Sequence, residues 1–348
     1  MRSGVTSHMV IAIVGATGLV GRTMCAVLHE RNVEFSSLRL LASSRSEGEV
    51  IAVGGIPYTV ESLQSDSFQG VDVALFSAGG SISKTYAPIA AAAGCIVIDN
   101  SSAWRMHGNV PLVVPEVNPL DVEQHHSIIA NPNCSTIQLV VALHPLHRLF
   151  NIKRVVVSTY QSVSGAGQKG VRQLETEIGG GTATNRISTH NLAYNTVFHT
   201  ADPASPADAP VTEEEAKIVR ETRRILHLPE LPMAVTCVRI PVTGGHAESV
   251  SIEFNSELPP VEEIRALLAS APGINVVDNL VADVYPTPLS AQNTDAVHIG
   301  RIRRDTSVPH GLQMWVVADN LRKGAATNAV QILELLQKLQ TVRSDNAE

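Results

Sequence analysis

The sequence is poor in cysteine. Its 348 residues include four cysteines, at positions 25, 95, 134 and 237, and no two of them form a C-x-x-C pair. This wide spacing excludes the common zinc-site and disulfide-framework signatures. A chain without paired cysteines is typical of a reducing compartment. We therefore expect a cytoplasmic protein with no metal site.

Long apolar runs and an excess of basic residues are also missing. No apolar run approaches the roughly 20 residues that a transmembrane helix needs, and residues 1–9 lack the apolar core of a secretion signal. The net charge of −7 disfavours a general nucleic-acid binder. The 44% hydrophobic and 17% charged residues are ordinary for a soluble protein, and the length suffices for two domains. We expect neither membrane nor nucleic acid as a partner.

A glycine-rich turn follows the first expected strand. The apolar run 10–14 predicts a buried parallel strand, and the residues GATGLVG follow at 15–21 before a helix over 19–30. Glycines there permit a tight turn and a close approach of the backbone to phosphate, which the helix N-terminus attracts. The spacing is G-x-x-G-x-x-G, and such a turn can also serve the chain path alone. The strand–turn–helix context favours a dinucleotide site that includes Gly15, Thr17, Gly18, Leu19 and Val20.

The second expected strand, 38–41, indicates which dinucleotide binds. An NAD-binding fold usually carries an acid at the end of this strand, to bind the ribose hydroxyls. This chain has Ser43, Arg45 and Ser46 there, and no acid before Glu47. A guanidinium and hydroxyl groups suit a 2′-phosphate, so the pattern favours NADP. The alternative is an ordinary solvated loop.

Strand and helix patterns divide the chain into two domains. Strands near 10–14, 38–41, 71–76, 96–99 and 128–130, with helices near 19–30 and 84–93, predict an α/β Rossmann-type doubly wound parallel sheet. We expect this NADP-binding domain to span 9–130, completed by a C-terminal helix over 320–342. The segment 131–319 predicts an α+β catalytic and dimerisation domain with a mixed sheet. Its expected strands lie near 154–163, 234–241, 247–255, 296–304 and 312–318, its helices near 168–178, 212–226 and 260–269, and 179–211 is an irregular excursion.

Cys134 is the strongest candidate for a catalytic residue. It lies in the run NPNCST, directly before the apolar, helix-like stretch 137–150. A helix N-terminus has unpaired N–H groups and a partial positive charge, which favour the thiolate that attacks carbonyl carbon. Buried structural cysteines are common. The polar neighbours and the upstream nucleotide motif favour the nucleophile.

Many ordered motifs make the chain similar to the aspartate-semialdehyde dehydrogenase family, from about residue 10 to about residue 340. They are GATGLVG (15–21), SSRS (43–46), FSAGGSISK (76–84), DNSSAWRM (99–106), VPEVN (114–118), NPNCST (131–136), YQSVSGAG (160–167), EEEAK (213–217), RIPVTGGH (239–246) and DNLRKGAATNAVQI (319–332). The resemblance implies an NADP-dependent oxidoreductase that acts as a homodimer or a dimer of dimers. It implies reductive dephosphorylation of L-aspartyl 4-phosphate to aspartate 4-semialdehyde, which feeds lysine, threonine, methionine and diaminopimelate biosynthesis.

The resemblance also implies roles for single residues. Cys134 would carry a thioester, Gln161 would orient the intermediate, and His246 would exchange protons. Arg239 would bind the substrate α-carboxylate and Glu215 its amino group. The leaving phosphate would bind Arg105, Lys217 and Asn133, and further contacts to the cofactor would come from Ser77, Gly79, Ser164, Gly165 and Asn320.

Several of these residues have a plain structural alternative. Arg239 could form an internal salt bridge with an acid such as Glu253, and Gln161 could be an exposed residue at a strand end. Thr212-x-x-Glu215 is a capping-box pattern, so Glu215 is as well explained by the start of a helix as by substrate.

Three rival functions share parts of this pattern. A reductase of N-acetylglutamyl phosphate typically has Gly-Cys-Tyr at the nucleophile, where this chain has Asn133-Cys134-Ser135. An acyl-CoA reductase would not need Arg105 and Lys217 for a phosphate leaving group. A non-catalytic NADP-binding paralogue would have no need of Cys134, Gln161, Arg239 and His246 together.

Overall fold

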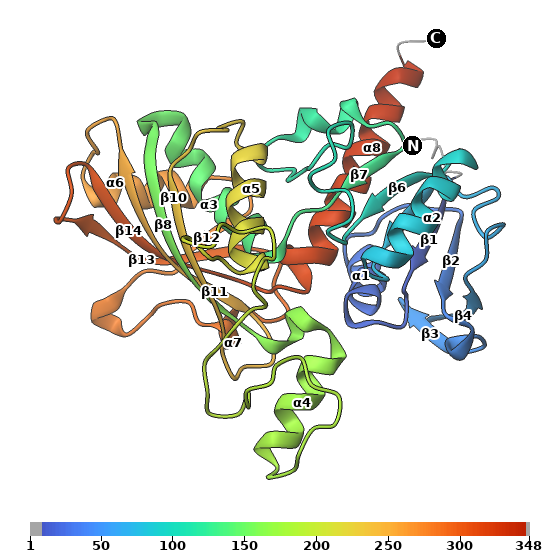
Figure 1. The fold of residues 1–348 in the computed structure, drawn as a ribbon. Helices are drawn as coiled ribbons and strands as arrows, with labels where there is room; N and C mark the ends of the chain where they lie inside the picture. Colours follow the sequence, from blue (N-terminus) through green and yellow to red (C-terminus); the bar gives the residue numbers. More distant parts are fainter. Residues whose placement is uncertain (1–8, 346–348) are drawn as a thin grey trace. The chain divides into compact units, whose positions relative to one another are not determined.

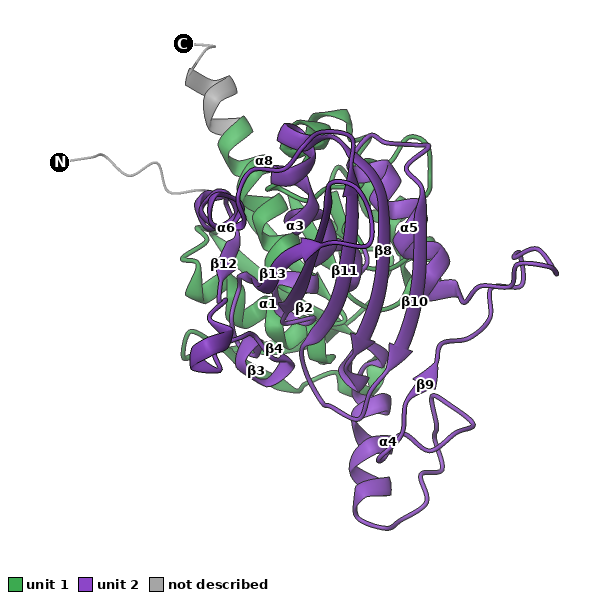
Figure 2. Ribbon diagram, turned by 90° about the vertical axis from the view of Figure 1, so that its left-hand side faces the viewer, with its two compact units in different colours: residues 1–132, 325–348 green, residues 133–324 purple. Residues whose placement is uncertain are grey.

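A computed structural model describes residues 9–345 (Figure 1). The segment 1–8, in which no secretion signal is expected, lies outside the described residues. The chain forms two compact units (Figure 2). Unit 1 comprises the residues up to 132 and those from 325 on, and unit 2 comprises residues 133–324. Among the described residues, no helix is both long enough and apolar enough to span a bilayer.

Unit 1 is built on a seven-stranded sheet in the order β3-β4-β2-β1-β5-β6-β7. All neighbours pair in parallel except β3 and β4, which form an antiparallel hairpin at the edge. The central strands are nearly continuous apolar runs, as expected where helices cover both faces of a parallel sheet. The strands are β1 (Val10–Val14), β2 (Ser37–Ala42), β3 (Val50–Val53), β4 (Ile56–Ser62), β5 (Val73–Phe76), β6 (Ile96–Asp99) and β7 (Ile128–Ala130).

The described part of unit 1 contains three α-helices. They are α1 (Leu19–Glu30), α2 (Gly80–Ala92) and α8 (Thr327–Asp345). The helix α8 returns from the far end of the sequence to pack beside α1, where Arg31 and Glu334 form an ion pair of 2.8 Å. A π-helical segment, Arg322–Ala326, precedes α8.

Unit 2 is built on a mixed sheet in the order β12-β13-β14-β11-β8-β10-β9. The strands are β8 (Ile152–Gln161), β9 (Val197–Phe198), β10 (Met233–Arg239), β11 (His246–Phe254), β12 (Ile274–Val276), β13 (Val297–Asp305) and β14 (Gly311–Ala318). The helices are α3 (Cys134–Phe150), α4 (Gln168–Ile178), α5 (Glu213–Ile225), α6 (Val261–Ser270) and α7 (Pro288–Ala291).

The two faces of this sheet differ. Helices α3, α5 and α6 pack against one face and bury it. On the other face, Val156 and Ser158 of β8 and Ser249 of β11 are only partly buried, beside the ring pair of Tyr160 and Trp315. We call this second side the open face of unit 2.

The predicted architecture is confirmed, and the elements that were not predicted are short. A doubly wound parallel sheet and a second domain with a mixed sheet are both present. The sequence patterns did not predict the β3–β4 hairpin, β9, β12 or α7, and β9 lies within the segment 179–211 that was expected to be irregular. The structure divides the chain at 132/133 and 324/325, where the sequence predicted 130/131 and 319/320.

Candidate active site

Three of the predicted residues lie at the ends of adjacent strands of unit 2. Arg239 on β10 is the parallel partner of Gln161 on β8. The antiparallel register of β8 and β11 pairs Tyr160 with Ala247, so continuing it by one residue brings His246 opposite Gln161. The strands thus align the three side chains on one face, although they are far apart in sequence. We call them the catalytic row.

Cys134 is the first residue of α3, as its sequence context predicted, and is half-buried. Asn133 caps the helix, because its side-chain oxygen accepts hydrogen bonds from the backbone N–H groups of Ser135 (2.9 Å) and Thr136 (3.2 Å). This cap fixes the turn of chain that carries the thiol. Gly324 closes in on the same residue, since a Cβ atom on it would lie 2.9 Å from Cys134 Cβ.

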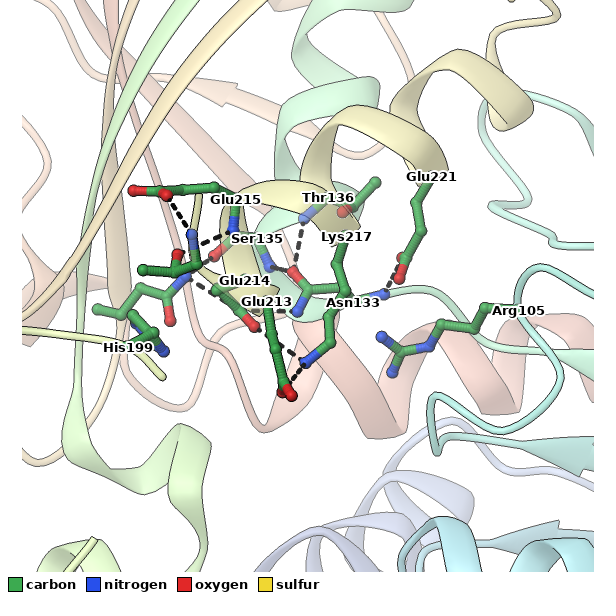
Figure 3. A network of polar contacts seen from close by, with 12 residues as sticks. Arg105, Asn133, Ser135, Thr136, His199, Glu213, Glu214, Glu215, Lys217 and Glu221 are labelled. Atoms are coloured by element: carbon green, nitrogen blue, oxygen red, sulfur yellow. Dashed lines mark hydrogen bonds and ion pairs between the residues drawn. The ribbon is translucent and has the colours of Figure 1, made fainter. Parts of the chain in front are cut away.

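A buried network joins the start of α3 to α5 (Figure 3). Asn133 donates its side-chain N–H to Glu214 Oε1 (2.8 Å) and its backbone N–H to Glu221 Oε2 (2.6 Å). Gln161 donates to Ser135 Oγ (2.8 Å) and to Glu214 Oε1 (3.2 Å). Both amide hydrogens of Gln161 thus form hydrogen bonds within the protein. Its influence on the nucleophile therefore passes through Ser135, the residue after Cys134.

Glu214 is a site residue that the sequence analysis missed. Burial alone would raise its pKa, but Lys217 and His199 nearby, with hydrogen bonds from Asn133 and Gln161, lower the pKa to about 2. Lys217 Nζ lies 3.5 Å from a Glu214 carboxylate oxygen. Glu214 is thus a permanently charged acid within the network. The run of three glutamates at 213–215 signalled an acid but could not tell which one faces the site.

Glu215 serves as a cap in this structure. Its carboxylate accepts a hydrogen bond from Thr212 N–H (2.7 Å), and its own N–H donates to Thr212 Oγ1 (3.3 Å), which completes the capping box at the start of α5. The second carboxylate oxygen accepts from Cys237 N–H (3.0 Å). The capping alternative for Glu215 is therefore realised, and its contact with substrate stays a prediction.

His246 is held as a neutral hydrogen-bond donor. Its Nδ1 lies 3.0 Å from the backbone nitrogen of Ser162, and a peptide N–H can only donate. The ring proton must therefore reside on Nε2, which is buried and has no partner among the described residues. Burial and the nearby Arg239 lower the pKa of His246 to about 3. The expected exchange of protons near neutral pH does not fit this environment.

Arg239 is half-buried and has no acid of its own. Among residues 9–345 it forms no salt bridge, and Glu253, the alternative partner, pairs with Lys153 (2.6 Å). Its guanidinium donates to the carbonyl oxygen of Ser162 and lies 3.4 Å from His199 Nδ1. A Cβ on Gly165 would lie 3.3 Å from Arg239 Nη1 and 3.2 Å from His246 Nε2. The glycine thus leaves space beside both groups.

The loop beside His246 is tied together by Asn320. The side-chain oxygen of Asn320 accepts hydrogen bonds from the hydroxyls of Ser162 (3.0 Å) and Ser164 (3.2 Å) and from the N–H of Gly245 (3.0 Å). Two of the predicted cofactor contacts, Ser164 and Asn320, therefore lie together with His246 in unit 2.

Unit 1 brings the predicted dinucleotide residues together. Gly15 has φ +85°, and a Cβ on it would lie 2.6 Å from Ser77 O, so the turn after β1 packs directly on the end of β5. Gly18, the N-cap of α1 before Leu19 and Val20, has no side-chain cap. The first-turn N–H groups of α1 thus lack that partner, which suits a phosphate. Gly79 is the N-cap of α2 and also has no side-chain cap; its φ is +85°, as at Gly15.

The residues that were expected to select NADP follow β2. Ser43 precedes a short helical turn that contains Arg45 and Ser46, and Ser46 Oγ lies 3.5 Å from Thr17 Oγ1 of the glycine-rich loop. Arg45 is exposed. This donor set fits a dinucleotide that carries a 2′-phosphate.

Arg105 is the predicted phosphate ligand of unit 1. It is 8% exposed and donates to the carbonyl oxygens of Asn131 (3.0 Å) and Asn100 (2.9 Å). Main-chain contacts of this kind hold a guanidinium in place.

Two family profiles match most of the chain. Residues 10–125 match the semialdehyde dehydrogenase NAD-binding domain, and residues 143–323 match the semialdehyde dehydrogenase dimerisation domain. The aspartate-semialdehyde dehydrogenase of Aquifex aeolicus is 53% identical over 336 residues, which cover 94% of this chain and 98% of that protein. The enzyme of Bacillus subtilis is 45% identical, with 95% and 98% covered.

Solved structures are similar over nearly the whole length. Aspartate-semialdehyde dehydrogenase II of Vibrio cholerae, complexed with ASA, has a TM-score of 0.89 and 43% identity, and covers 95% of this chain and 99% of that one. The Candida albicans enzyme with NADP has a TM-score of 0.72 and 26% identity, with 95% and 99% covered.

Proposed function

This chain belongs to the aspartate-semialdehyde dehydrogenase family, and we propose on that premise that it reduces L-aspartyl 4-phosphate to L-aspartate 4-semialdehyde through a thioester on Cys134. The observation that carries the proposal lies within unit 2. There, Cys134 at the start of α3 is linked through Ser135 to a row of strand-end residues, Gln161, Arg239 and His246. A nucleophile, a cation and a neutral donor are the groups that acyl transfer on an anionic substrate needs.

NADPH is the cofactor that the residues of unit 1 fit. Gly15, Gly18 and Gly79 leave the backbone open to a pyrophosphate, and Ser43, Arg45 and Ser46 suit the 2′-phosphate. When bound, the cofactor supplies the hydride that reduces the acyl group. The likeness to the Candida albicans enzyme with NADP supports this choice.

The covalent steps begin at the thiolate of Cys134. Cys134 Sγ attacks the acyl carbon of aspartyl phosphate, a C–S bond forms, and the C–O bond to the phosphate breaks. Lys217, beside Asn133 and Glu214, is the cation of unit 2 that would stabilise the leaving dianion. Reduction gives a tetrahedral hemithioacetal oxyanion. Its collapse breaks the C–S bond, releases the aldehyde and restores the thiolate.

The neighbouring groups have separate tasks. His246 Nε2–H, held neutral, donates a hydrogen bond to the oxygen of the tetrahedral species. Arg239 supplies a bidentate partner for the substrate α-carboxylate. Glu214 is the charged acid of the network and the better candidate than Glu215 for the substrate ammonium group. Arg105, Ser164, Gly165 and Asn320 keep the roles that the resemblance implies.

We also propose a homodimer for the working enzyme. Residues 143–323 match a dimerisation domain, and unit 2 has an open sheet face with a large aromatic pair. Large aromatic side chains on an uncovered sheet face are typical of an interaction surface. A second copy of this chain is the partner that accords with the matched domain.

A spectrophotometric assay tests the reaction in reverse. Purified protein should reduce NADP when aspartate semialdehyde and phosphate are both present, and should not do so without phosphate. N-acetylglutamate semialdehyde, or coenzyme A in place of phosphate, should give at most a small rate. Turnover with either of these alone would overturn the assignment in favour of the related reductases.

A further inference from the structure

His199 is a partly buried polar residue of unit 2 that the mechanism above does not use. It follows β9, the edge strand that pairs with β10. In that register Val197 lies opposite Arg239, and Phe198 lies opposite Val238. Side chains alternate along a strand, so His199 lies on the same face as Val197 and Arg239. The fold thus adds a fourth side chain beside the catalytic row.

The contact with Arg239 fixes the tautomer of His199. Its Nδ1 lies 3.4 Å from Arg239 Nη2, and a guanidinium can only donate. Nδ1 must therefore accept, and the ring proton resides on Nε2. Burial, with Arg239 close by, lowers the pKa of His199 to about 4, although Glu214 opposes this. The ring is thus neutral at physiological pH and offers one donor.

That donor has no acceptor. His199 Nε2 is buried and forms no hydrogen bond with any residue that the structure describes. A buried polar group without a partner is costly and is usually satisfied by something that binds. The charged groups that act on the ring are Arg239, Glu214, Lys217 and Glu215, and Glu215 already accepts from Thr212 and Cys237. Glu214 already accepts from Asn133 and Gln161 and lies near Lys217, whereas Arg239 has no salt bridge among the described residues.

We propose that His199 is a further substrate-binding residue, which recognises the substrate α-carboxylate together with Arg239 through its Nε2–H. A carboxylate has two oxygens and about four acceptor positions, so it can accept from both side chains. The carboxylate would accept a hydrogen bond from His199 Nε2–H and would also form a salt bridge with Arg239, which has none among the described residues. This inference rests on the proposed function, in which Arg239 binds that carboxylate.

Two substitutions separate the donor from the rest of the ring. His199→Gln places an amide N–H near the position of Nε2, whereas His199→Asn reaches only the position of Nδ1. Both residues are polar, so neither puts a new apolar group beside Arg239. His190→Asn, at an exposed histidine of the same excursion, is the matched control. Thermal unfolding of all three variants shows whether each is folded.

The kinetic test compares two aldehydes that differ in one group. L-Aspartate 4-semialdehyde carries the α-carboxylate, and 3-aminopropanal lacks it. We expect His199→Asn to raise the KM for aspartate semialdehyde about tenfold, the loss of one hydrogen bond to a charged group. The kcat and the KM values for NADP and phosphate should change little. The preference in kcat/KM for aspartate semialdehyde over 3-aminopropanal should fall about tenfold, and His199→Gln should largely restore it.

Other outcomes overturn the proposal. An unchanged KM in folded His199→Asn would assign the ring to packing alone. Equal losses with both aldehydes would exclude recognition of the carboxylate, and a raised KM for phosphate alone would place the donor on the other anion. Failure of the proposed function looks different, because the wild-type protein would then not oxidise aspartate semialdehyde at all.

Discussion

At the scale of single residues, Gly324 sets the space beside the nucleophile. A Cβ atom on it would lie 2.9 Å from Cys134 Cβ and 3.3 Å from Cys134 Cα, and real Cβ atoms hardly ever approach as closely as the first distance. The residue belongs to the π-helical segment before α8, a type of turn that is frequent at functional sites. The sequence showed Gly324 only as part of the motif DNLRKGAATNAVQI, because a contact between residues 190 positions apart leaves no local pattern.

Gly324→Ala should therefore impair catalysis more than cofactor binding. The added methyl group displaces Cys134, and a misplacement of about 1 Å can cost about a hundredfold in rate. We expect kcat to fall between about tenfold and a hundredfold, with the Kd for NADP little changed, as measured by steady-state kinetics and calorimetry. Gly108→Ala, where a Cβ would meet open space, is the control. A wild-type kcat in Gly324→Ala would contradict this role.

The environment of His246 leads to a prediction on pH dependence. Because burial and Arg239 hold the pKa of His246 near 3, its protonation cannot produce a titration between pH 5 and 8. We expect the log of kcat against pH to show no acid limb near pH 6.5 that depends on this ring. His246→Gln should lower kcat by about the same factor at every pH in this range. An acid limb present in the wild type and lost in the variant would show that the ring exchanges protons instead.

Single residues also mark the limit of prediction from sequence. Cys134 was found because a cap sequence and an apolar helix adjoin it. Glu214 was missed, since three successive glutamates look alike until α5 is turned towards Asn133 and Gln161. His199 was passed over because its contact with Arg239 depends on the pairing of β9 with β10. Local motifs reveal a nucleophile or a helix cap. Which other side chains lie beside it depends on the register between strands that are distant in sequence.

At the scale of elements, a second buried row lies beneath the catalytic row. Glu248, Thr159 and Cys237 are neighbours across β11, β8 and β10, each two residues further into the sheet than a member of the catalytic row. All three are fully buried. Burial raises the pKa of Glu248 well above its ordinary value, with a smaller opposing effect of Gln138. Burial in the core below the site thus favours the neutral form of this carboxyl group.

Glu248→Gln should stabilise the protein in a pH-dependent way. The pKa of a glutamate carboxyl is about 4.3 in the unfolded chain. When the pKa is higher in the folded protein, the carboxyl adds its full share to the free energy of unfolding below about pH 4.3. That share is lost as the pH rises towards the folded-state pKa. The amide has no proton to lose. We expect the variant to melt higher than the wild type at pH 8, by about 2–4 °C for each kcal/mol gained, and the difference to vanish near pH 4. A lower Tm at pH 8 would show that the carboxyl is needed in its charged form.

Regular elements were predicted where their patterns are long. The helix 168–178 and the central strands of unit 1 were placed within a residue or two. The β3–β4 hairpin was not predicted because its strands are short: Gly54-Gly55 joins a strand of four residues to one of seven at the sheet edge. The short strand β12 and the helix α7 were not predicted for the same reason, because three or four residues are too few to show a periodic pattern of apolar side chains.

At the scale of the whole molecule, the open face of unit 2 is the feature that an isolated chain does not explain. Its central strands present Val156 and Ser158, small enough for a second sheet to approach closely, with Tyr160 and Trp315 beside them. The chain as a whole was predictable as two domains from alternation and motifs. Its assembly was predictable only through the family resemblance, because no motif in one strand shows which sheet face remains uncovered.

Val156→Glu should convert a dimer into monomers. A carboxylate in the middle of the open face would be buried without a partner, opposite or near its own copy. We expect light scattering to give about twice the 37.1 kDa chain mass for the wild type and the single chain mass for the variant. Gln69→Glu, at an exposed position of unit 1, should leave the mass unchanged. A monomeric wild type, or a dimeric Val156→Glu, would rule out this face as the interface.

The most direct test of the covalent mechanism is to trap the acyl group on the protein. Enzyme mixed with aspartate semialdehyde and NADP, without phosphate, should form one equivalent of NADPH in a burst, and mass spectrometry should find one aspartyl group per chain on Cys134. Phosphate should then discharge it, and Cys134→Ala should still bind NADP but show neither burst nor adduct. An adduct on another residue, or comparable turnover by Cys134→Ala, would contradict the thioester mechanism.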